Sequence, residues 1–204
     1  MVGANVESPL NGVWHTRSMD FSRWADIRDE LLERVARQHC VNPFPPARVL
    51  GLVVELLGYQ LVTDPELGEG LRAVVDVVAR TIRQNPRWSP DPRRCTPARL
   101  RQAVAHEIGH VVLHTHELLA GVRSERQEIE AEAFARVFLV PRQLVLRSRR
   151  LRAIEQSTGR QRSNQVAGLA DELWVTPELV WVRLREAGLV EPASRVNIRK
   201  GVVG

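Results

Sequence analysis

The residues with the clearest chemical potential lie in one short segment of this 204-residue chain, His106-Glu107-Ile108-Gly109-His110. Two histidines four residues apart share one face of a helix, so both imidazoles can reach a single ion. Glu107 lies about 100° further round the helix, where it can take a proton from a water on that ion without binding the ion. Zinc lowers the pKa of such a water to about 7. The segment therefore predicts one zinc ion per chain, with His106 and His110 as ligands and Glu107 as general base.

A catalytic zinc site also needs a third protein ligand and an open position. His116 follows His110 by six residues, as in the metzincin motif, but Leu113 replaces the glycine of that motif. Both methionines of the chain lie upstream, so the downstream methionine turn is missing as well. The remaining candidate is Glu128, on the next predicted helix, with Glu132 on the same face as the fallback ligand.

Two helices with clear end signals carry these residues. Thr96-Pro97 opens the first, which should extend to about Leu119, and Gly121 ends it. Ser124-Glu125-Arg126-Gln127 is a capping box that opens the second helix, and Pro141 terminates it. Small alanines beside the acidic face would let the two helices approach closely as an antiparallel pair. This hairpin would bring Glu128 over the histidines.

Periodicity and turn residues predict the other elements. Helices are predicted over Phe21 to about His39, over Val49 to Leu57 and from Leu144. Two more helices are predicted over Val166 to Leu189, split near Thr176-Pro177. Strands are predicted at Tyr59 to Val62 and within the valine-rich stretch Leu71 to Arg83, and a loop over Asn85 to Pro97. The strands are expected to form a small antiparallel sheet. The C-terminal helices read as a helix-turn-helix-like unit.

Composition narrows the class of protein. With 44% apolar and 26% charged residues, the chain can form one globular domain and is not disordered as a whole. It has neither an apolar run of about 18 residues nor a secretory leader, so no membrane association is expected. Two cysteines, Cys40 and Cys95, are too few for a disulfide scaffold, which favours a cytoplasmic location. The net charge of +5 arises from 29 basic residues, all but Lys200 being arginine.

The two helices of the hairpin resemble the ImmA/IrrE metallopeptidases. Arg99 to His114 is similar to the active-site helix of that family, including the form H-E-x-G-H-x-x-L-H. Glu128 to Pro141 is similar to the family pattern E-x-x-A-N-x-F-A-x-x-L-L-M-P, and the likeness extends over roughly residues 21 to 190. The resemblance implies that Glu128 is the third zinc ligand. Glu132 stands where the family usually has asparagine, and it would either orient a histidine ligand or compete with Glu128 for the ion.

The resemblance also implies a fold and a function. The fold would be α+β and mostly helical, with a zincin-like pair of active-site helices, a three-stranded antiparallel sheet and a helical C-terminal part. We expect an irregular arm over residues 1–20, a zinc metallopeptidase core over 21–143 and a helical C-terminal region over 144–204. Similar proteins cleave or otherwise inactivate a helix-turn-helix (Xre-like) repressor, often after DNA damage, and so derepress stress, defence or mobile-element genes. The expected activity is that of a zinc metalloendopeptidase.

Several residues carry weaker predictions. His114 continues the histidine series and would pack against or support a ligand, with roles as an alternative ligand or in stabilising the transition state also open. Cys95 is a candidate regulatory thiol, which would fill the open zinc position only if its loop folded back. A cluster of arginines could contact single-stranded DNA as an activating signal; the candidates are Arg147, Arg149, Arg150 and Arg152.

A second interpretation belongs to another class of protein. The helix-turn-helix-like tail and the arginine clusters would suit a non-proteolytic regulator that binds DNA or sequesters a repressor, with a structural zinc site. The intact H-E-x-x-H argues against it, because a structural site does not need Glu107.

Overall fold

The structure is a computed structural model that describes residues 21–190. The arm expected over residues 1–20, and the last part of the expected region 144–204, lie outside the described residues. The elements are α1 (Phe21–His39), η1 (Pro46–Arg48), α2 (Leu50–Leu56), β1 (Gln60–Thr63), β2 (Ala73–Asp76), β3 (Thr81–Gln84), η2 (Pro92–Arg94), α3 (Pro97–Leu119), α4 (Glu125–Leu139), α5 (Arg142–Arg147), α6 (Arg149–Gln156), α7 (Gly159–Leu173) and α8 (Pro177–Glu186). The chain is α+β and mostly helical, as predicted.

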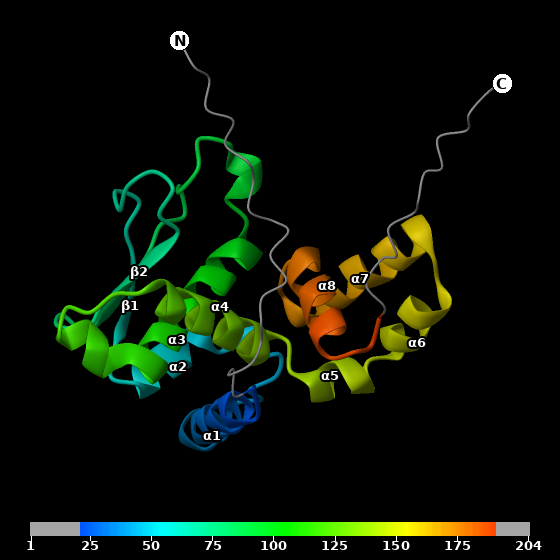
Figure 1. The fold of residues 1–204 in the computed structure, drawn as a ribbon, viewed down its shortest axis with the longest axis horizontal. Helices are drawn as coiled ribbons and strands as arrows, with labels where there is room; N and C mark the ends of the chain where they lie inside the picture. Colours follow the sequence, from blue (N-terminus) through cyan, green and yellow to red (C-terminus); the bar gives the residue numbers. More distant parts are fainter. Residues whose placement is uncertain (1–20, 191–204) are drawn as a thin grey trace, which may run out of the picture.

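Helices α3 and α4 form the centre of the molecule. They pack against each other more extensively than any other pair of described elements. The sheet lies at one end of this pair and α6 to α8 lie at the other, while α1 runs beneath α4 (Figure 1). A continuous cluster of buried apolar side chains joins these layers, and Phe134 and Phe138 of α4 are among its largest fully buried members. Burying this much apolar surface is the main force that fixes α4 between α1 and α3.

The sheet is mixed, so the prediction of an antiparallel sheet was wrong. The strand order is β1-β3-β2, in which β3 pairs with β2 antiparallel and with β1 parallel. The valine-rich stretch folds as the hairpin β2–β3, because the Asp76 side chain accepts the N–H groups of Val78 and Ala79 at 3.0 and 2.8 Å and closes the turn. The fully buried Ile82 then places β3 in the middle, where it runs in the same direction as β1.

The C-terminal helices form a helix-turn-helix-like pair that packs on the core. α7 begins at Gly159, seven residues before the predicted start at Val166. It ends at Leu173, and the following Trp174 adopts the left-handed conformation, with φ of 61°. Thr176 caps α8 by accepting the N–H of Leu179 at 3.3 Å. No helix within residues 21–190 is long and apolar enough to cross a membrane.

Candidate metal centre

Helix α3 places both histidines on one buried face. Thr96 caps the helix by accepting the N–H of Arg99 at 3.4 Å, and Pro97 occupies its first turn, as the sequence predicts. Ten residues further along, His106 and His110 lie one turn apart with ring centroids 4.7 Å from each other. The His110 side chain is only 5% exposed and that of His106 is 19% exposed. The face is therefore sheltered but still open at His106.

Helix α4 approaches α3 closely enough to present its first turn to these rings. The predicted capping box is present, because Ser124 accepts the N–H of Gln127 at 3.3 Å while the Gln127 side chain accepts the N–H of Ser124 at 2.9 Å. Further along the helix, a Cβ built on Gly109 would lie 3.0 Å from the Cα and carbonyl oxygen of Ala131. Any side chain at position 109 would be crowded against the Ala131 backbone at this spacing. The glycine therefore sets the distance from Glu128 to the histidines.

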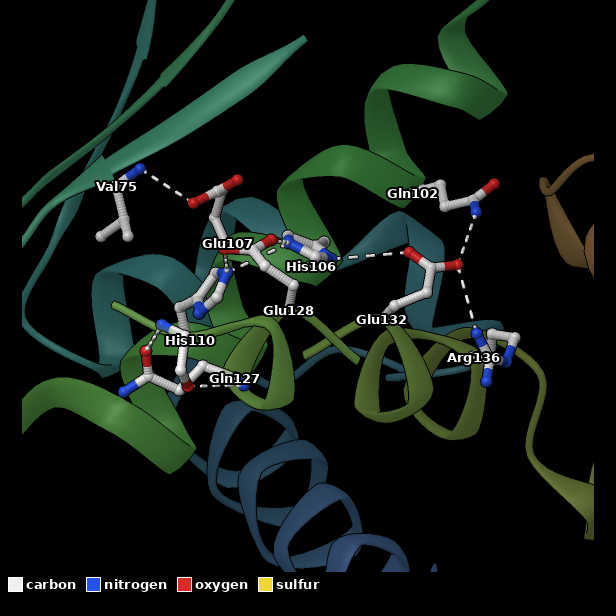
Figure 2. Close-up of polar contacts among 10 residues, drawn as sticks. Val75, Gln102, His106, Glu107, His110, Gln127, Glu128, Glu132 and Arg136 are labelled. Atoms are coloured by element: carbon white, nitrogen blue, oxygen red, sulfur yellow. Dashed lines mark hydrogen bonds and ion pairs between the residues drawn. The ribbon is translucent and has the colours of Figure 1, made fainter. Parts of the chain in front are cut away.

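Three side chains converge at this crossing (Figure 2). His106 Nε2 lies 3.1 Å from Glu128 Oε2 and 3.1 Å from His110 Nε2, and His110 Nε2 lies 3.4 Å from Glu128 Oε1. Ligands about 2.0–2.1 Å from a tetrahedral zinc ion lie about 3.3 Å from one another. Each imidazole nitrogen thus has the other one and its nearer Glu128 oxygen at about this separation, and one ligand atom from each residue lies within 4.8 Å of the others. We call Nε2 of His106, Nε2 of His110 and the Glu128 carboxylate the three donors. Their types and spacing fit a metal ion.

The protonation states of the two imidazoles differ because their surroundings differ. Burial, and to a smaller extent the neighbouring His106, lower the pKa of His110 to about 4. Burial alone would also lower the pKa of His106, but its contact with Glu132 and the surrounding carboxylates outweigh burial and raise that pKa. His110 is accordingly neutral at pH 7, which is the form of imidazole that binds a metal ion.

Glu107 lies outside the group of three donors, and one oxygen of its carboxylate is directed at the sheet. Its Oε2 accepts the backbone N–H of Val75 in β2 at 2.9 Å (Figure 2). Burial is the main reason that the pKa of this carboxyl is raised, because desolvation penalises the charged form. One carboxylate oxygen is thereby fixed, and Oε1 is left for a proton-transfer partner.

Glu132 contacts Nδ1 of His106, whereas Glu128 faces Nε2 of the same ring. Glu132 Oε2 lies 3.5 Å from His106 Nδ1. Its Oε1 accepts from Gln102 Nε2 at 3.3 Å and from Arg136 Nη1 at 3.4 Å. Burial would raise the pKa of Glu132, but the contact with His106 and the charge of Arg136 lower it. Of the two roles left open by the sequence, the geometry favours orientation of a histidine, since Glu132 lies outside the group of three donors.

Two other candidate residues lie outside the group of three donors. His114 is buried, and its Nε2 lies 3.6 Å from Glu130 Oε2, within ion-pair distance but beyond hydrogen-bonding distance. Cys95 directs its thiol at the carbonyl oxygen of Ser89, 3.5 Å away, in the loop before α3. A role for Cys95 at the metal centre stays a prediction.

The arginines proposed to contact nucleic acid lie on α5 and α6. Arg150 is engaged within the protein, since it pairs with Glu172 and donates to Gln165 at 3.3 Å. Arg147, Arg149 and Arg152 are exposed. Among the described residues these three form no ion pair.

A cavity of about 1080 Å³ opens beside the metal centre. His106, Glu128 and Glu132 line it, and so do Arg183 and Glu186 of α8. Its apolar lining comes from Phe21, Ala25, Ile129 and Val137 of α1 and α4, and Arg28, Arg136 and Arg142 add charged groups. A cavity of this size and lining can hold several residues of an extended peptide beside the three donors.

Comparison with known proteins places the chain in a family. The family model described as the IrrE N-terminal-like domain, Peptidase M78, matches residues 70–185, which is more than half of the chain. The chain belongs to this family. The matched range contains the three convergent donors, Glu107 and Glu132. It supports the predicted ImmA/IrrE membership and makes this a domain of the metallopeptidase type.

Other comparisons add less. Among solved structures, the chain is similar to a Mycobacterium tuberculosis transcriptional regulator at 17% sequence identity and a TM-score of 0.47. The similarity covers 79% of this chain and 51% of the regulator, so the chain spans about half the length of that protein. No curated protein matches the chain.

Some residues that shape the site were not anticipated from the sequence. Gly109 was part of the motif, but its contact with Ala131 depends on how two helices cross. Gln102 and Arg136 have the right spacing to join Glu132, four residues from His106 and Glu132 respectively, so helical periodicity could have signalled them. Val75 contacts Glu107 through its backbone N–H, so no pattern of side-chain types in the sequence could predict this contact.

Proposed function

We propose that the protein is a zinc-dependent endopeptidase that cleaves a helix-turn-helix repressor and so derepresses the genes under its control. The observation that carries the proposal is the convergence of the three donors, one ligand atom of each lying within 4.8 Å of the others, beside the buried Glu107, which does not belong to them. A His, His, Glu set with an open position is the pattern of catalytic zinc, whereas structural sites are closed by four protein ligands. Membership of a peptidase family supports the same conclusion.

His106, His110 and Glu128 would hold the ion. When bound, zinc supplies a Lewis acid that polarises the peptide carbonyl and makes water acidic enough to react at neutral pH. Glu107 accepts the proton of the attacking water at Oε1 while Val75 holds its other oxygen. As the water oxygen bonds to the carbonyl carbon and the C–N bond breaks, Glu107 returns the proton to the departing amine. The cavity beside Glu128 orients the peptide.

The test is cleavage of a helix-turn-helix repressor encoded next to this protein, by the wild-type protein and by Glu107→Gln. The amide can still accept the Val75 N–H, so the variant should fold and bind one zinc per chain, but it has no proton acceptor. Cleavage should fall by about 10²- to 10⁴-fold. Glu117→Gln is the matched control, because Glu117 is an exposed glutamate on the same helix. Retained cleavage by Glu107→Gln would refute the mechanism.

A second candidate function is non-proteolytic binding of DNA or of a repressor. It is favoured by the exposed and unpaired Arg147, Arg149 and Arg152 described above. The same arginines would serve single-stranded DNA as an activator of the peptidase. Binding of an oligothymidylate, followed by fluorescence anisotropy, should weaken steeply with salt and decline when the three arginines become glutamine. Absence of binding at low salt would remove both ideas and leave the peptidase.

A further inference from the structure

Glu132 connects the metal centre to the C-terminal helical part of the protein. We propose that Glu132 is a positioning residue for His106, and that Arg136 and Glu186 tie it to α8, so that docking of the C-terminal helices tunes the affinity of the site for its ion. The inference rests on the proposed metal centre but not on peptide hydrolysis.

The first step is the contact between Glu132 and His106. His106 presents Nε2 to Glu128 and to His110, so only Nδ1 is free to be held from behind. Glu132 Oε2 faces that nitrogen at 3.5 Å, which is ion-pair distance and the outer limit of a hydrogen bond. A carboxylate here favours the tautomer with the proton on Nδ1 and the lone pair on Nε2. That is the tautomer required for Nε2 to bind a metal ion.

The second step is the support of Glu132 itself. The side chain is 39% exposed and would be free to rotate without partners. Gln102 on α3 and Arg136 on α4 both donate to its Oε1, at 3.3 and 3.4 Å. These two donors leave Oε2 directed at His106 (Figure 2). The carboxylate is therefore held from both helices of the site.

The third step leads from Arg136 to α8. Arg136 Nε donates to Glu186 Oε1 at 2.9 Å, and Arg183 Nη1 donates to Glu186 Oε2 at 2.7 Å. Arg183 also donates through Nε to the carbonyl oxygen of Val140, just after α4, at 3.3 Å. The side chains of Arg136 and Arg183 are 18% and 10% exposed, so these pairs are screened less than surface ion pairs.

The arrangement divides the charge of Arg136 between two carboxylates. Arg136 makes its shorter contact with Glu186, at 2.9 Å, and its longer one with Glu132, at 3.4 Å. The charge of Glu132 is therefore only partly neutralised by Arg136 and can still attract His106. If Glu186 is neutralised or α8 moves away, Arg136 can pair fully with Glu132 and draw it from His106. Loosening the C-terminal part should therefore weaken metal binding without any change in the three ligands.

The experiment is a zinc titration of metal-free, full-length protein against a chromophoric chelator, with Co²⁺ absorption as a second readout. Glu132→Ala should bind zinc about 10- to 100-fold more weakly, as is typical when the partner of a metal-binding histidine is removed. Glu132→Gln, which keeps an acceptor oxygen, should recover part of this loss. Glu186→Gln should weaken binding several-fold. Glu125→Gln, which removes the same charge from an exposed position of α4, should bind as the wild type does.

The double variant Glu132→Ala/Glu186→Gln separates the proposed route from general destabilisation. If Glu186 acts through Glu132, the double variant binds zinc no more weakly than Glu132→Ala alone. Additive losses overturn the connection to α8, and unchanged affinity in Glu132→Ala overturns the positioning role. If Glu132→Gln recovers nothing and the Co²⁺ spectrum changes its coordination type, Glu132 is itself a ligand and the inference is wrong.

The outcomes also distinguish this inference from the proposed function. A wild-type chain that binds no zinc refutes the metal centre and the positioning role together. The expected order of zinc affinities without cleavage of any repressor refutes the peptidase and supports the positioning role. Each variant is accepted only if its metal-free unfolding midpoint matches that of the wild type, so that loss of fold is not counted as loss of affinity.

Discussion

Both ring nitrogens of His106 have a contact within the site. Nε2 faces Glu128 and His110, and Nδ1 faces the carboxylate of Glu132. His110 differs, because it is more deeply buried and its Nδ1 has no hydrogen-bond partner among the described residues. The two imidazoles of one motif therefore play unequal parts. His106 is adjustable through its neighbours, whereas His110 is held neutral by burial, which lowers its pKa to about 4.

This burial predicts a pH dependence of stability for the metal-free protein. The pKa of His110 is about 4 when folded and about 6.5 when unfolded. Below pH 6.5 the unfolded chain binds a proton that the folded chain does not, so the free energy of unfolding falls as the pH falls toward 4. Between pH 7 and pH 5 the loss should be about 2 kcal/mol.

Urea unfolding in the presence of a chelator measures this loss, and His110→Gln is the control. The raised pKa of His106 acts in the opposite sense, contributing stability below pH 6.5 that is lost as the pH rises through its folded pKa. His106 is present in both proteins, so the difference between them isolates His110. An equal loss in wild type and His110→Gln would contradict the account.

At the scale of elements, the site depends on where α3 crosses α4 and on what β2 adds. At the crossing, a Cβ built on Gly109 would lie 3.0 Å from the Ala131 backbone, so the missing side chain of Gly109 lets the two helices approach closely. The edge strand β2 contributes the N–H of Val75 that orients Glu107. The sheet thus orients the carboxylate of Glu107, and the crossing of α3 and α4 brings Glu128 close to the two histidines.

Gly109→Ala tests the crossing. Alanine favours an isolated helix by about 1 kcal/mol over glycine, but its Cβ would lie 3.0 Å from the Ala131 backbone, and such overpacking costs about 1–3 kcal/mol. We expect a net loss of stability, and weaker zinc binding because α4 carries Glu128 away from the histidines.

Gly51→Ala in α2 is the matched control, because a Cβ there meets nothing within 4 Å. It should raise stability by about 0.5–1 kcal/mol and leave zinc affinity unchanged. Both substitutions are read by urea unfolding and zinc titration. Wild-type zinc affinity in Gly109→Ala would show that the crossing does not set the site.

At the scale of the whole molecule, the helical C-terminal part is joined to the core by polar as well as apolar contacts. Arg136 and Arg183 converge on Glu186, which lines the same cavity as the metal centre. Because folded protein binds the ion and unfolded protein does not form the site, the ion should stabilise the molecule as a unit.

Metal removal tests this linkage. At a free zinc concentration 100 times the Kd, the gain in unfolding free energy is about 2.7 kcal/mol, which for a chain of this size raises Tm by about 5–10 °C. Scanning calorimetry with zinc and with a chelator should show this difference in the wild type. Glu128→Ala should show a much smaller difference at the same zinc concentration, and an equal one would contradict the ligand set.

Much of this organisation follows from local signals in the sequence. The helix bearing His106 and the helix bearing Glu128 each begin at a cap that acts over three residues, Thr96 to Arg99 and Ser124 to Gln127. The starts of both helices could therefore be predicted from the sequence. The face shared by Glu128 and Glu132 follows from helical periodicity in the same way. The local chemistry of the site was therefore predictable.

The features that could not be predicted from the sequence depend on contacts between segments that are far apart in the chain. The direction of β1 relative to β3 is decided by the path of the chain across the sheet, and strand patterns are the same for both directions. The contact of Val75 with Glu107 uses a backbone group, and that of Arg136 with Glu186 joins residues 50 positions apart. No periodicity links such positions.

The most direct test of the metal centre is anomalous diffraction at the zinc edge from crystals of the zinc-loaded protein. The account predicts a single peak about 2.0–2.2 Å from Nε2 of His106, Nε2 of His110 and a carboxylate oxygen of Glu128. It also predicts that Glu107 and Glu132 lie outside this distance. A peak bound elsewhere, or one coordinated by Glu132 in place of Glu128, would contradict the account.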